Sequence, residues 1–375
     1  MDRKKICILQ NGLSRGGTDT FVVNLCQGLD PMKYDITVVN PCLQKEKNVR
    51  ESEVLATGAS VIHTADLGAG LWSIIRHFIL LFQVLRKGRY DVFQTNIDLF
   101  NGPNLFVAWL AGVPIRCCHS HNTMQQKALV KGQTLPIRLY QGLMKWMCWT
   151  FSNRRSGCSR DAMEFLFSGK DWQSSPYPIV INNGIDLKVF SGQQRTESKM
   201  RELGLTARYH LVTVGRIIPQ KNPLFLANVF VELCKMRKDV DLVWVGIGEL
   251  QKQCETLFKS SHCLDRVHFL GSRRDIPEIL PCCDLFFMPS AFEGLGIVII
   301  EAQAAGLNCL VSDVVPVEAN CGAVAYKSLH DSVESWASEI CDFLDKKKQL
   351  MLDNAKLQSF SIQHMVEQMQ QLFEK

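Results

Sequence analysis

Short apolar runs alternate with helix-length segments along the first half of the chain. Runs rich in Val and Ile predict strands at 5–9, 35–39, 60–63, 91–95, 115–120, 155–158 and 179–181. The segments between them predict helices at 18–29, 72–86, 105–111, 136–150 and 159–167. Near-continuous apolar strands separated by helices are typical of a parallel sheet that is covered on both faces.

The second half repeats this alternation. Its predicted strands are 210–214, 241–245, 267–270, 285–288 and 308–311, and its predicted helices are 223–236, 250–259, 295–305, 332–344 and 361–373. Two consecutive series indicate an α/β protein made of two Rossmann-like, doubly wound domains. The break lies near residues 172–183, where Ser174-Ser175-Pro176-Tyr177-Pro178 has the composition of a linker. Ligands of open α/β sheets bind beyond the carboxyl ends of the strands, so we expect the site in a cleft between the two domains.

Composition narrows the class of protein. The chain has 375 residues, of which 46% are apolar and 21% are charged, which excludes a disordered chain and a small disulfide-stapled fold. Its 15 cysteines are scattered and contain no Cys-x-x-Cys pair, so neither a zinc ribbon nor a thioredoxin-type site is indicated. We interpret them as small buried hydrophobic residues in a reducing compartment.

The charge is unevenly distributed along the chain. Residues 1–182 carry 21 Lys and Arg against 13 Asp and Glu, whereas residues 183–375 carry 21 against 24. The excess of cations in the first half points to an anionic partner and leaves nucleic acid, an anionic membrane and a phosphorylated substrate open. The alternative is that these side chains only keep the domain soluble.

No segment reads as a secretory signal or a membrane span. The apolar run 78–82 is far shorter than the roughly 18 residues that a span needs. We therefore expect a cytoplasmic protein, with peripheral attachment to the inner face of the plasma membrane as an open alternative. Segments 72–89 and 139–149 are apolar and aromatic with basic residues nearby, as in helices that lie in an anionic interface, but buried helices share this pattern.

Two motifs in the first half lie where strands are expected to end. Gly16 and Gly17 open a predicted helix, where glycine lets backbone approach an anion closely, although a tight turn would look the same. His119 and His121 end the strand at 115–120 and share one of its faces. They either face a substrate or pack in the core, and no third ligand lies close by in sequence, so we expect no metal site.

Two motifs in the second half combine glycine with a strand end. Gly215 is followed by Arg216 and Lys221 ahead of a predicted helix, an arrangement that suits a diphosphate unless both cations are ordinary surface charges. Gly246 and Gly248 follow the next strand, and they permit close backbone approach to a nucleotide or simply form a turn.

Glu293 and Glu301 form the most specific motif. If the seven residues between them are mostly helical, their carboxylates lie up to about 12 Å apart. This suits two ends of a nucleotide sugar better than an acid–base pair at one bond, which needs roughly 5–10 Å. Glu301 interrupts an apolar helix, so its burial implies a ligand hydroxyl or a cation, with a structural salt bridge as the alternative.

These motifs, and their order along the chain, resemble those of the retaining family-4 glycosyltransferases, which have the GT-B architecture. The resemblance covers nearly the whole chain and includes a His motif that is similar to that of bacterial exopolysaccharide and capsule enzymes. It rests on Gly16-Gly17-Thr18, His119-Ser120-His121-Asn122-Thr123, the hinge-like segment 180–186, Gly215-Arg216 with Lys221, and Glu293 with Glu301. It implies an N-terminal acceptor-binding domain at 1–180, to which a C-terminal helix at 360–375 returns, and a donor-binding domain at 183–357.

The resemblance also implies the roles of single residues. Arg216 and Lys221 would bind the donor diphosphate and stabilise the leaving group without a metal. Glu301 would bind the ribose hydroxyls, and Glu293 would contact the donor sugar. His121 would approach the sugar from the first domain. On the donor side the resemblance adds Gly16, Gly17, Gly215, Gly246, Gly248, Arg274, Gly294, Leu295 and Gly296, and on the acceptor side it adds His119 and Asn122.

These implications predict a retaining, metal-independent glycosyltransferase that uses a nucleotide sugar, expected to be UDP-linked, and no cofactor. The acceptor would be a saccharide or a polyprenyl-pyrophosphate-linked intermediate of exopolysaccharide, capsule or lipopolysaccharide synthesis. A pyrophosphate lipid on an anionic membrane fits the basic first half better than nucleic acid does. Two alternatives stay open: a sugar-nucleotide 2-epimerase of the same architecture and a non-catalytic nucleotide-sugar-binding subunit.

Overall fold

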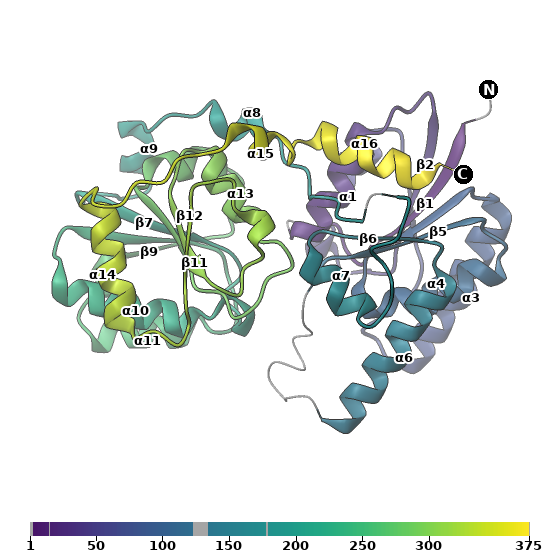
Figure 1. Cartoon of the computed structure of the whole chain (residues 1–375), viewed down its shortest axis with the longest axis horizontal. Coiled ribbons are helices and arrows are strands. Elements are labelled where there is room, and N and C mark those ends of the chain that lie inside the picture. The colour runs from purple at the N-terminus through teal and green to yellow at the C-terminus, as the bar shows by residue number, and fades with distance from the viewer. Residues whose placement is uncertain (1–2, 15, 123–133, 178, 375) are drawn as a thin grey trace. The chain divides into compact units, whose positions relative to one another are not determined.

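The computed structural model describes residues 3–14, 16–122, 134–177 and 179–374 of the chain (Figure 1). Thr123 and Pro178, which belong to the His motif and the linker above, lie outside the described residues. The chain divides into two compact units: unit 1 comprises residues 1–185 with 359–375, and unit 2 comprises residues 186–358. Each unit has its own six-stranded parallel sheet with helices packed on it, which confirms the predicted doubly wound α/β class.

The sheet of unit 1 has the strand order β3-β2-β1-β4-β5-β6. Its strands are β1 (Lys4–Leu9), β2 (Tyr34–Asn40), β3 (Ser60–His63), β4 (Val92–Thr95), β5 (Ile115–Ser120) and β6 (Arg154–Gly157). The helices of unit 1 are α1 (Gly17–Gly28), α2 (Glu51–Leu55), α3 (Leu71–Gly88), α4 (Asn101–Leu110), α6 (Leu135–Phe151), α7 (Arg160–Phe167) and α16 (Ile362–Phe373).

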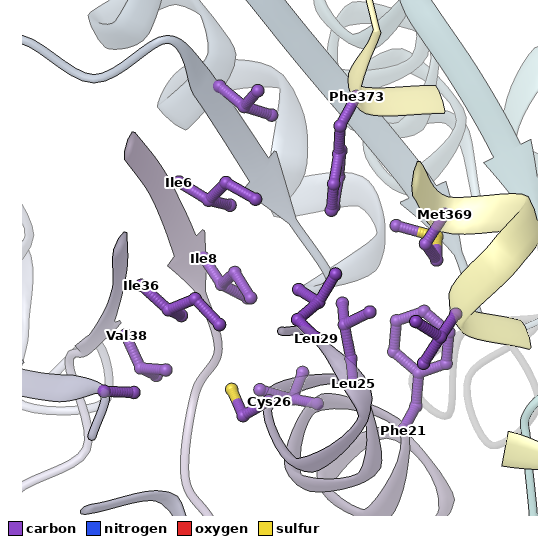
Figure 2. Packing of buried hydrophobic residues seen from close by; sticks show 14 of the residues in the cluster. Ile6, Ile8, Phe21, Leu25, Cys26, Leu29, Ile36, Val38, Met369 and Phe373 are labelled. Atoms are coloured by element: carbon purple, nitrogen blue, oxygen red, sulfur yellow. The ribbon is translucent and has the colours of Figure 1, made fainter. Parts of the chain in front are cut away.

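Helices cover both faces of this sheet. On one face α1 and α16 pack over the strands, and Figure 2 shows Phe21 of α1 beside Met369 of α16. A Cβ on Gly28 of α1 would lie 2.4 Å from the side chain of Val366 in α16, so the two helices come this close only because residue 28 is glycine. On the other face α3, α4, α6 and α7 supply the buried side chains. The C-terminal helix is therefore part of the core of unit 1.

The sheet of unit 2 has the strand order β12-β11-β10-β7-β8-β9. Its strands are β7 (Tyr209–Val214), β8 (Val240–Val245), β9 (Val267–Gly271), β10 (Leu285–Met288), β11 (Cys309–Ser312) and β12 (Val324–Lys327). Its helices are α8 (Leu187–Ser191), α9 (Glu197–Glu202), α10 (Pro223–Met236), α11 (Gln251–Ser260), α12 (Ile276–Ile279), α13 (Ile297–Ala304), α14 (Val333–Leu344) and α15 (Asn354–Gln358).

Two predicted elements differ from the structure. The segment 179–181 is not a strand of the sheet: it forms a single bridge, from Val180 to Gly157, before the chain turns away toward Ile185. The helix predicted from residue 295 begins at Ile297, because Gly296 adopts a left-handed conformation with φ of +81°. Of the seven residues between Glu293 and Glu301, 294–296 are therefore loop and 297–300 are helix, so just over half of the connection is helical.

All 15 cysteines are free thiols, and all except Cys341 are buried. Burial raises the pKa of Cys26 to about 12 and that of Cys254 to about 11, so these thiols are protonated and unreactive. This confirms their interpretation as small core residues. In the described part of the chain, no helix is long and apolar enough to cross a membrane.

Candidate active site

The central contact of unit 2 joins two motifs that are far apart in sequence. Lys221 ends a short 3₁₀ turn (Pro219–Lys221) after β7, and its Nζ lies 2.6 Å from Oε1 of Glu293 in the loop after β10. The Glu293 side chain is only 5% exposed and that of Lys221 is 20% exposed. Lys221 is therefore not a free surface cation, and the structural salt bridge considered for Glu301 belongs to Glu293 instead.

Backbone contacts hold the two loops of this ion pair together. The Ala291 amide donates to the carbonyl of Gln220 over 2.8 Å, and the Gln220 side chain donates to the carbonyl of Phe292 over 3.4 Å. Because β7 and β10 are neighbouring parallel strands, their carboxyl ends meet at one edge of the sheet. The ion pair therefore lies at the sheet edge where the sequence predicted the site.

Helix α13 begins next to this pair. Lys221 Nζ lies 3.8 Å from the sulfur of Met288, and a Cβ at Gly296 would lie 3.7 Å from the methyl group of the same side chain. Gly294, Leu295 and Gly296 are buried in the loop that leads into the helix. The free N–H groups of a helix N-terminus beside an ammonium group can bind an anion.

Glu301, in the second turn of α13, is partly buried, and burial raises its pKa from 4.5 to about 7. Within the described residues, no side chain or backbone group forms a hydrogen bond or ion pair with its carboxylate, whereas its backbone carbonyl accepts a hydrogen bond from the Ala305 amide. A carboxyl group that is desolvated without a partner is costly, so a ligand that brings hydroxyl groups or a cation would stabilise it.

The glycines after β8 have a structural role that sequence analysis did not foresee. A Cβ on Gly246 would lie 1.9 Å from the carbonyl oxygen of Gly215, and a Cβ on Gly248 would lie 2.3 Å from that of Ile217. The Ile217 amide also donates to the carbonyl of Ile247 over 3.0 Å. These glycines are therefore required for the packing of one loop on the other. Their contact with a nucleotide stays a prediction.

The structure does not bring the two predicted arginines into the Lys221–Glu293 pair. Arg216 and Arg274 are both exposed. The neighbouring Arg273 instead forms ion pairs with Asp275, at 2.6 Å, and with Glu202, at 2.5 Å. Arg216 and Arg274 are thus free to turn toward a ligand, whereas Arg273 is engaged in the protein.

In unit 1 the glycine loop is held by Asp19. Gly16 precedes the first turn of α1, and Asp19 in that turn accepts hydrogen bonds from the side chain of Gln10 at 2.6 Å and from the amide of Ser14 at 3.1 Å. Burial raises the pKa of Asp19, and these hydrogen bonds act in the opposite direction. Gly17 is the first helical residue, so both predicted glycines lie at the N-terminus of α1, where an anion is favoured.

The two histidines share one face of β5, as the alternation predicted. Their ring centroids lie 4.5 Å apart, and Phe21 of α1 stacks on His119 at 4.8 Å and meets His121 edge-on at 5.2 Å. His119 is fully buried and is bonded to the Ser156 hydroxyl at 2.7 Å, as a packed core histidine would be. Burial lowers the pKa of His121 to about 3, so its imidazole is neutral at physiological pH.

The side chains that support His121 were not among those predicted from the sequence. Asp98, at the carboxyl edge beyond β4, accepts hydrogen bonds from the His121 amide at 3.3 Å and from the side chain of Asn122. The side-chain oxygen of Asn96 lies 3.4 Å from Nε2 of His121 and accepts a hydrogen bond from Gln94 at 3.0 Å. The sequence signal that could have identified these residues is the run of polar side chains at the end of a buried strand. In the structure Asp98 has a φ of +53°, which is rare outside glycine.

Several polar atoms at this edge of unit 1 have no partner. Among the described residues, the side-chain oxygens of Gln10 and Gln94, Nε2 of His119 and Nδ1 of His121 are buried without a hydrogen bond. Unsatisfied buried polar groups are rare in folded proteins and are concentrated at functional sites. The described residues contain no group of three or more His, Cys, Asp or Glu side chains arranged to hold a metal ion.

The chain is similar in sequence to several known proteins. Residues 195–350 match the family described as Glycosyl transferases group 1. A protein of Bacillus subtilis (strain 168) named as a glycosyltransferase, EpsF, is 29% identical over 347 residues, which cover 90% of this chain and 87% of that protein. The UDP-Gal:alpha-D-GlcNAc-diphosphoundecaprenol alpha-1,3-galactosyltransferase of Escherichia coli is 31% identical over 246 residues, or 64% of this chain and 62% of the enzyme.

A solved structure extends the likeness to the whole fold. Anabaena Alr3699/HepE, solved in complex with UDP and glucose, matches this chain with a TM-score of 0.80 and 16% sequence identity over 98% of each chain. At this level of identity the match shows the fold alone. Together with the family match, it confirms the resemblance that the motifs predicted: the chain is a glycosyltransferase of the GT-B fold, and residues 195–350, within its unit 2, match the group 1 glycosyltransferases.

Proposed function

We propose that this glycosyltransferase transfers a sugar, with retention of its anomeric configuration, from a UDP-sugar to a lipid-linked saccharide of cell-surface polysaccharide synthesis. The observation that carries the proposal is the Lys221–Glu293 ion pair beside the N-terminus of α13, one helix turn away from a desolvated Glu301. A cation, free helix amides and two carboxylates match the diphosphate, ribose and hexose of a nucleotide sugar.

The donor half of the proposal assigns one ligand group to each feature. Lys221 and the first amides of α13 bind the diphosphate, and the exposed Arg216 folds onto it when the donor enters. Glu301 accepts hydrogen bonds from the ribose hydroxyls, which replace the water that burial removes. Glu293, oriented by Lys221, accepts hydrogen bonds from the transferred sugar. Charge that develops on the departing diphosphate is stabilised by these fixed cations and amides, without a metal ion.

The state of His121 supports a reaction without a protein base. A histidine whose pKa is near 3 is a weak proton acceptor, so it cannot efficiently deprotonate an acceptor hydroxyl. We therefore assign to His121 a neutral hydrogen-bonding role toward the donor sugar. The leaving phosphate oxygen then takes the acceptor proton on the face from which it departs, which retains the anomeric configuration.

We assign the acceptor from the basic charge of unit 1 and from the name of a similar enzyme. The Escherichia coli relative is named for an acceptor linked to diphosphoundecaprenol, and unit 1 carries the excess of basic residues that a pyrophosphate lipid would favour. We propose the same class of acceptor for this chain.

A direct test is the release of UDP from a panel of UDP-sugars by the full chain with membrane-extracted lipid acceptors. We expect acceptor-dependent release with one sugar, and at least a hundredfold lower kcat for Glu301→Gln and Lys221→Met. Glu334→Gln, at an exposed position on α14, is the matched control and should retain full activity. Full activity of Glu301→Gln would refute the donor assignment. Conversion of a UDP-sugar without any acceptor would indicate the 2-epimerase instead, and binding without turnover would indicate a non-catalytic subunit.

A further inference from the structure

The large exposed apolar side chains of the described residues are unevenly distributed. Half of them, including every exposed aromatic one, lie on α3, α4 and α6, which cover one face of the unit 1 sheet. We call the exposed apolar side chains of these three helices the apolar face. A concentration of this kind on one side of a soluble domain usually marks an interaction surface.

Helix α3 has two apolar stripes instead of one. Its inner stripe is buried in the core of unit 1, and its outer stripe consists of Trp72, Ile75, Ile79 and Phe82 at helical spacing. Trp72 is 82% exposed. An amphipathic helix needs only the inner stripe to pack on its sheet, so the outer stripe does not serve the folding of unit 1.

Helix α6 repeats the arrangement. Leu135, Leu139, Leu143 and Trp146 follow one another at intervals of four, four and three residues on its exposed side, while Met144 and Cys148 face the core. The stripe therefore runs along most of the helix.

Helix α4 joins the two stripes into one surface. It packs against both α3 and α6, as Figure 1 shows for unit 1. Trp109 at its C-terminal end is exposed and lies 5.6 Å from Phe151 of α6, which also contacts Trp146 at 6.0 Å. Arg86 of α3 donates to the carbonyl of Ala111, just beyond α4, over 3.3 Å.

The charges around the apolar face are of one sign. None of the three helices contains an acidic residue, and the sequence has no Asp or Glu from 67 to 90 or from 99 to 160. Exposed basic side chains lie beside the apolar stripes: Arg76 one turn from Trp72 on α3, Lys87 at the end of α3, and Arg138 one turn from Leu135 on α6. Lys145 is excluded from this set, because its ammonium lies 4.6 Å from the Phe165 ring.

We propose that the apolar face is a membrane-docking surface, on which α3, α4 and α6 lie in the interface of an anionic lipid bilayer. Trp, Tyr and Leu side chains beside Lys and Arg, without carboxylates, are typical of surfaces that bind anionic bilayers in this way. The proposal does not depend on which donor or acceptor the enzyme uses.

The orientation of the helices connects this surface to the chemistry. A helix that follows a parallel strand starts at the carboxyl edge of that strand, and this edge of unit 1 carries His121 and the N-terminus of α1. The most exposed members of the apolar face lie at or near the start of their helices: Leu71 and Trp72 on α3, and Leu135 and Leu139 on α6. The bilayer is thereby placed next to the site edge of unit 1, where a lipid-linked substrate would arrive.

The test is flotation of the full chain with vesicles, without donor or acceptor. Vesicles of phosphatidylcholine with about a quarter phosphatidylglycerol should bind the protein at about 0.1 M salt, and pure phosphatidylcholine should bind it far less. We expect Trp72→Ser with Leu139→Ser to weaken binding at least tenfold, and Arg76→Gln with Arg138→Gln to weaken it about fivefold for each charge. Met32→Ser with Met351→Ser, at positions 82% and 87% exposed elsewhere, should bind as the wild type does.

Two results would overturn the proposal. One is vesicle binding by Trp72→Ser with Leu139→Ser that equals that of the wild type, provided that thermal melting shows both proteins folded. The other is an absence of vesicle binding by the wild type together with a dimer in light scattering that the same double variant abolishes, since a second copy would then cover the apolar face. Quenching of Trp fluorescence by lipids brominated in their acyl chains should be reduced in Trp72→Ser if this side chain enters the bilayer, and the remaining quenching should come from Trp109 and Trp146 of the same face.

Discussion

A double-mutant cycle can separate the contribution of the Lys221–Glu293 ion pair to stability from its contribution to catalysis. Lys221→Met removes the ammonium group, keeps most of the volume of the side chain, and leaves a carboxylate that is only 5% exposed without its nearest cation. Glu293→Gln keeps the shape of the glutamate and removes its charge. The double variant removes both charges, so that no buried group is left with an unbalanced charge.

The magnitude follows from the burial of the two partners. Exposed ion pairs contribute about 0–1 kcal/mol, whereas breaking a buried pair by removing one partner costs about 3–5 kcal/mol. Because Lys221 is 20% exposed and Glu293 is 5% exposed, this pair lies between the two limits. We expect Lys221→Met to lower the stability of the loop after β10 by about 2 kcal/mol and the double variant to recover more than half of that loss.

Hydrogen exchange at the Ala291 amide reports this loss, because that amide bonds to the carbonyl of Gln220 and so joins the two loops. A change of about 2 kcal/mol corresponds to exchange roughly 30-fold faster in Lys221→Met. UDP release should stay at least a hundredfold reduced in the double variant, because the diphosphate still lacks its ammonium group. Lys235→Met, which breaks an exposed pair with Glu232, is the matched control and should change neither measurement. Recovery of activity in the double variant would show that the pair is only structural, and unchanged exchange in Lys221→Met would refute the argument from burial.

Three further predictions concern stability. Gly246→Ala should cost at least about 3 kcal/mol in urea unfolding, because its Cβ would meet a carbonyl oxygen at 1.9 Å, whereas Gly142→Ala, which has open space in helix α6, should stabilise the protein by about 0.5–1 kcal/mol. The pKa of His121 is lowered to about 3, so the unfolded chain binds a proton below its usual pKa of 6.5 and the folded chain does not. As the pH is lowered from 6.5 to 3, the free energy of unfolding should therefore fall by up to about 1.4 kcal/mol per pH unit, and it should fall less steeply in His121→Asn. The pKa of Glu301 is raised to about 7, so its favourable contribution is present below 4.5 and is lost as the pH rises through 7. Glu301→Gln should accordingly raise the melting temperature at about pH 8 and leave it nearly unchanged at about pH 4.

The fold followed from the sequence wherever a strand is buried on both sides. The strand β8, for example, is buried at all six positions, and its apolar run predicted it almost to the residue. The edge strand β12 was missed, because three of its four residues are only partly buried and Ala325 and Lys327 weaken the strand pattern. The five-residue helices α2, α8 and α15 were missed because they are too short to display a helical period.

The sequence indicated the residues of the candidate site but not the contacts between them. Lys221 and Glu293 belong to different motifs, and only the pairing of β7 with β10 makes them neighbours. The glycines after β8 illustrate the opposite case. Their spacing suggested approach to a ligand, yet the atoms that exclude a Cβ are those of the adjacent protein loop. A glycine motif indicates that another group approaches the backbone closely, but the sequence does not show whether that group is a ligand or a neighbouring loop of the protein.

The two histidines show how one pattern can support two roles. Alternation places both on the same side of β5, so this pattern does not rank them, whereas the family resemblance assigned His121 to the donor sugar. His119 lies inside the strand, where Ser156 and the Phe21 ring hold it as a packed side chain. His121 lies one residue beyond the strand, on backbone that Asp98 holds. Within the described residues Nε2 of His119 has no hydrogen-bond partner, and neither has Nδ1 of His121. Because a neutral imidazole can offer that nitrogen to a sugar hydroxyl without a change of charge, the position at the strand end, and not the residue type, makes His121 the candidate.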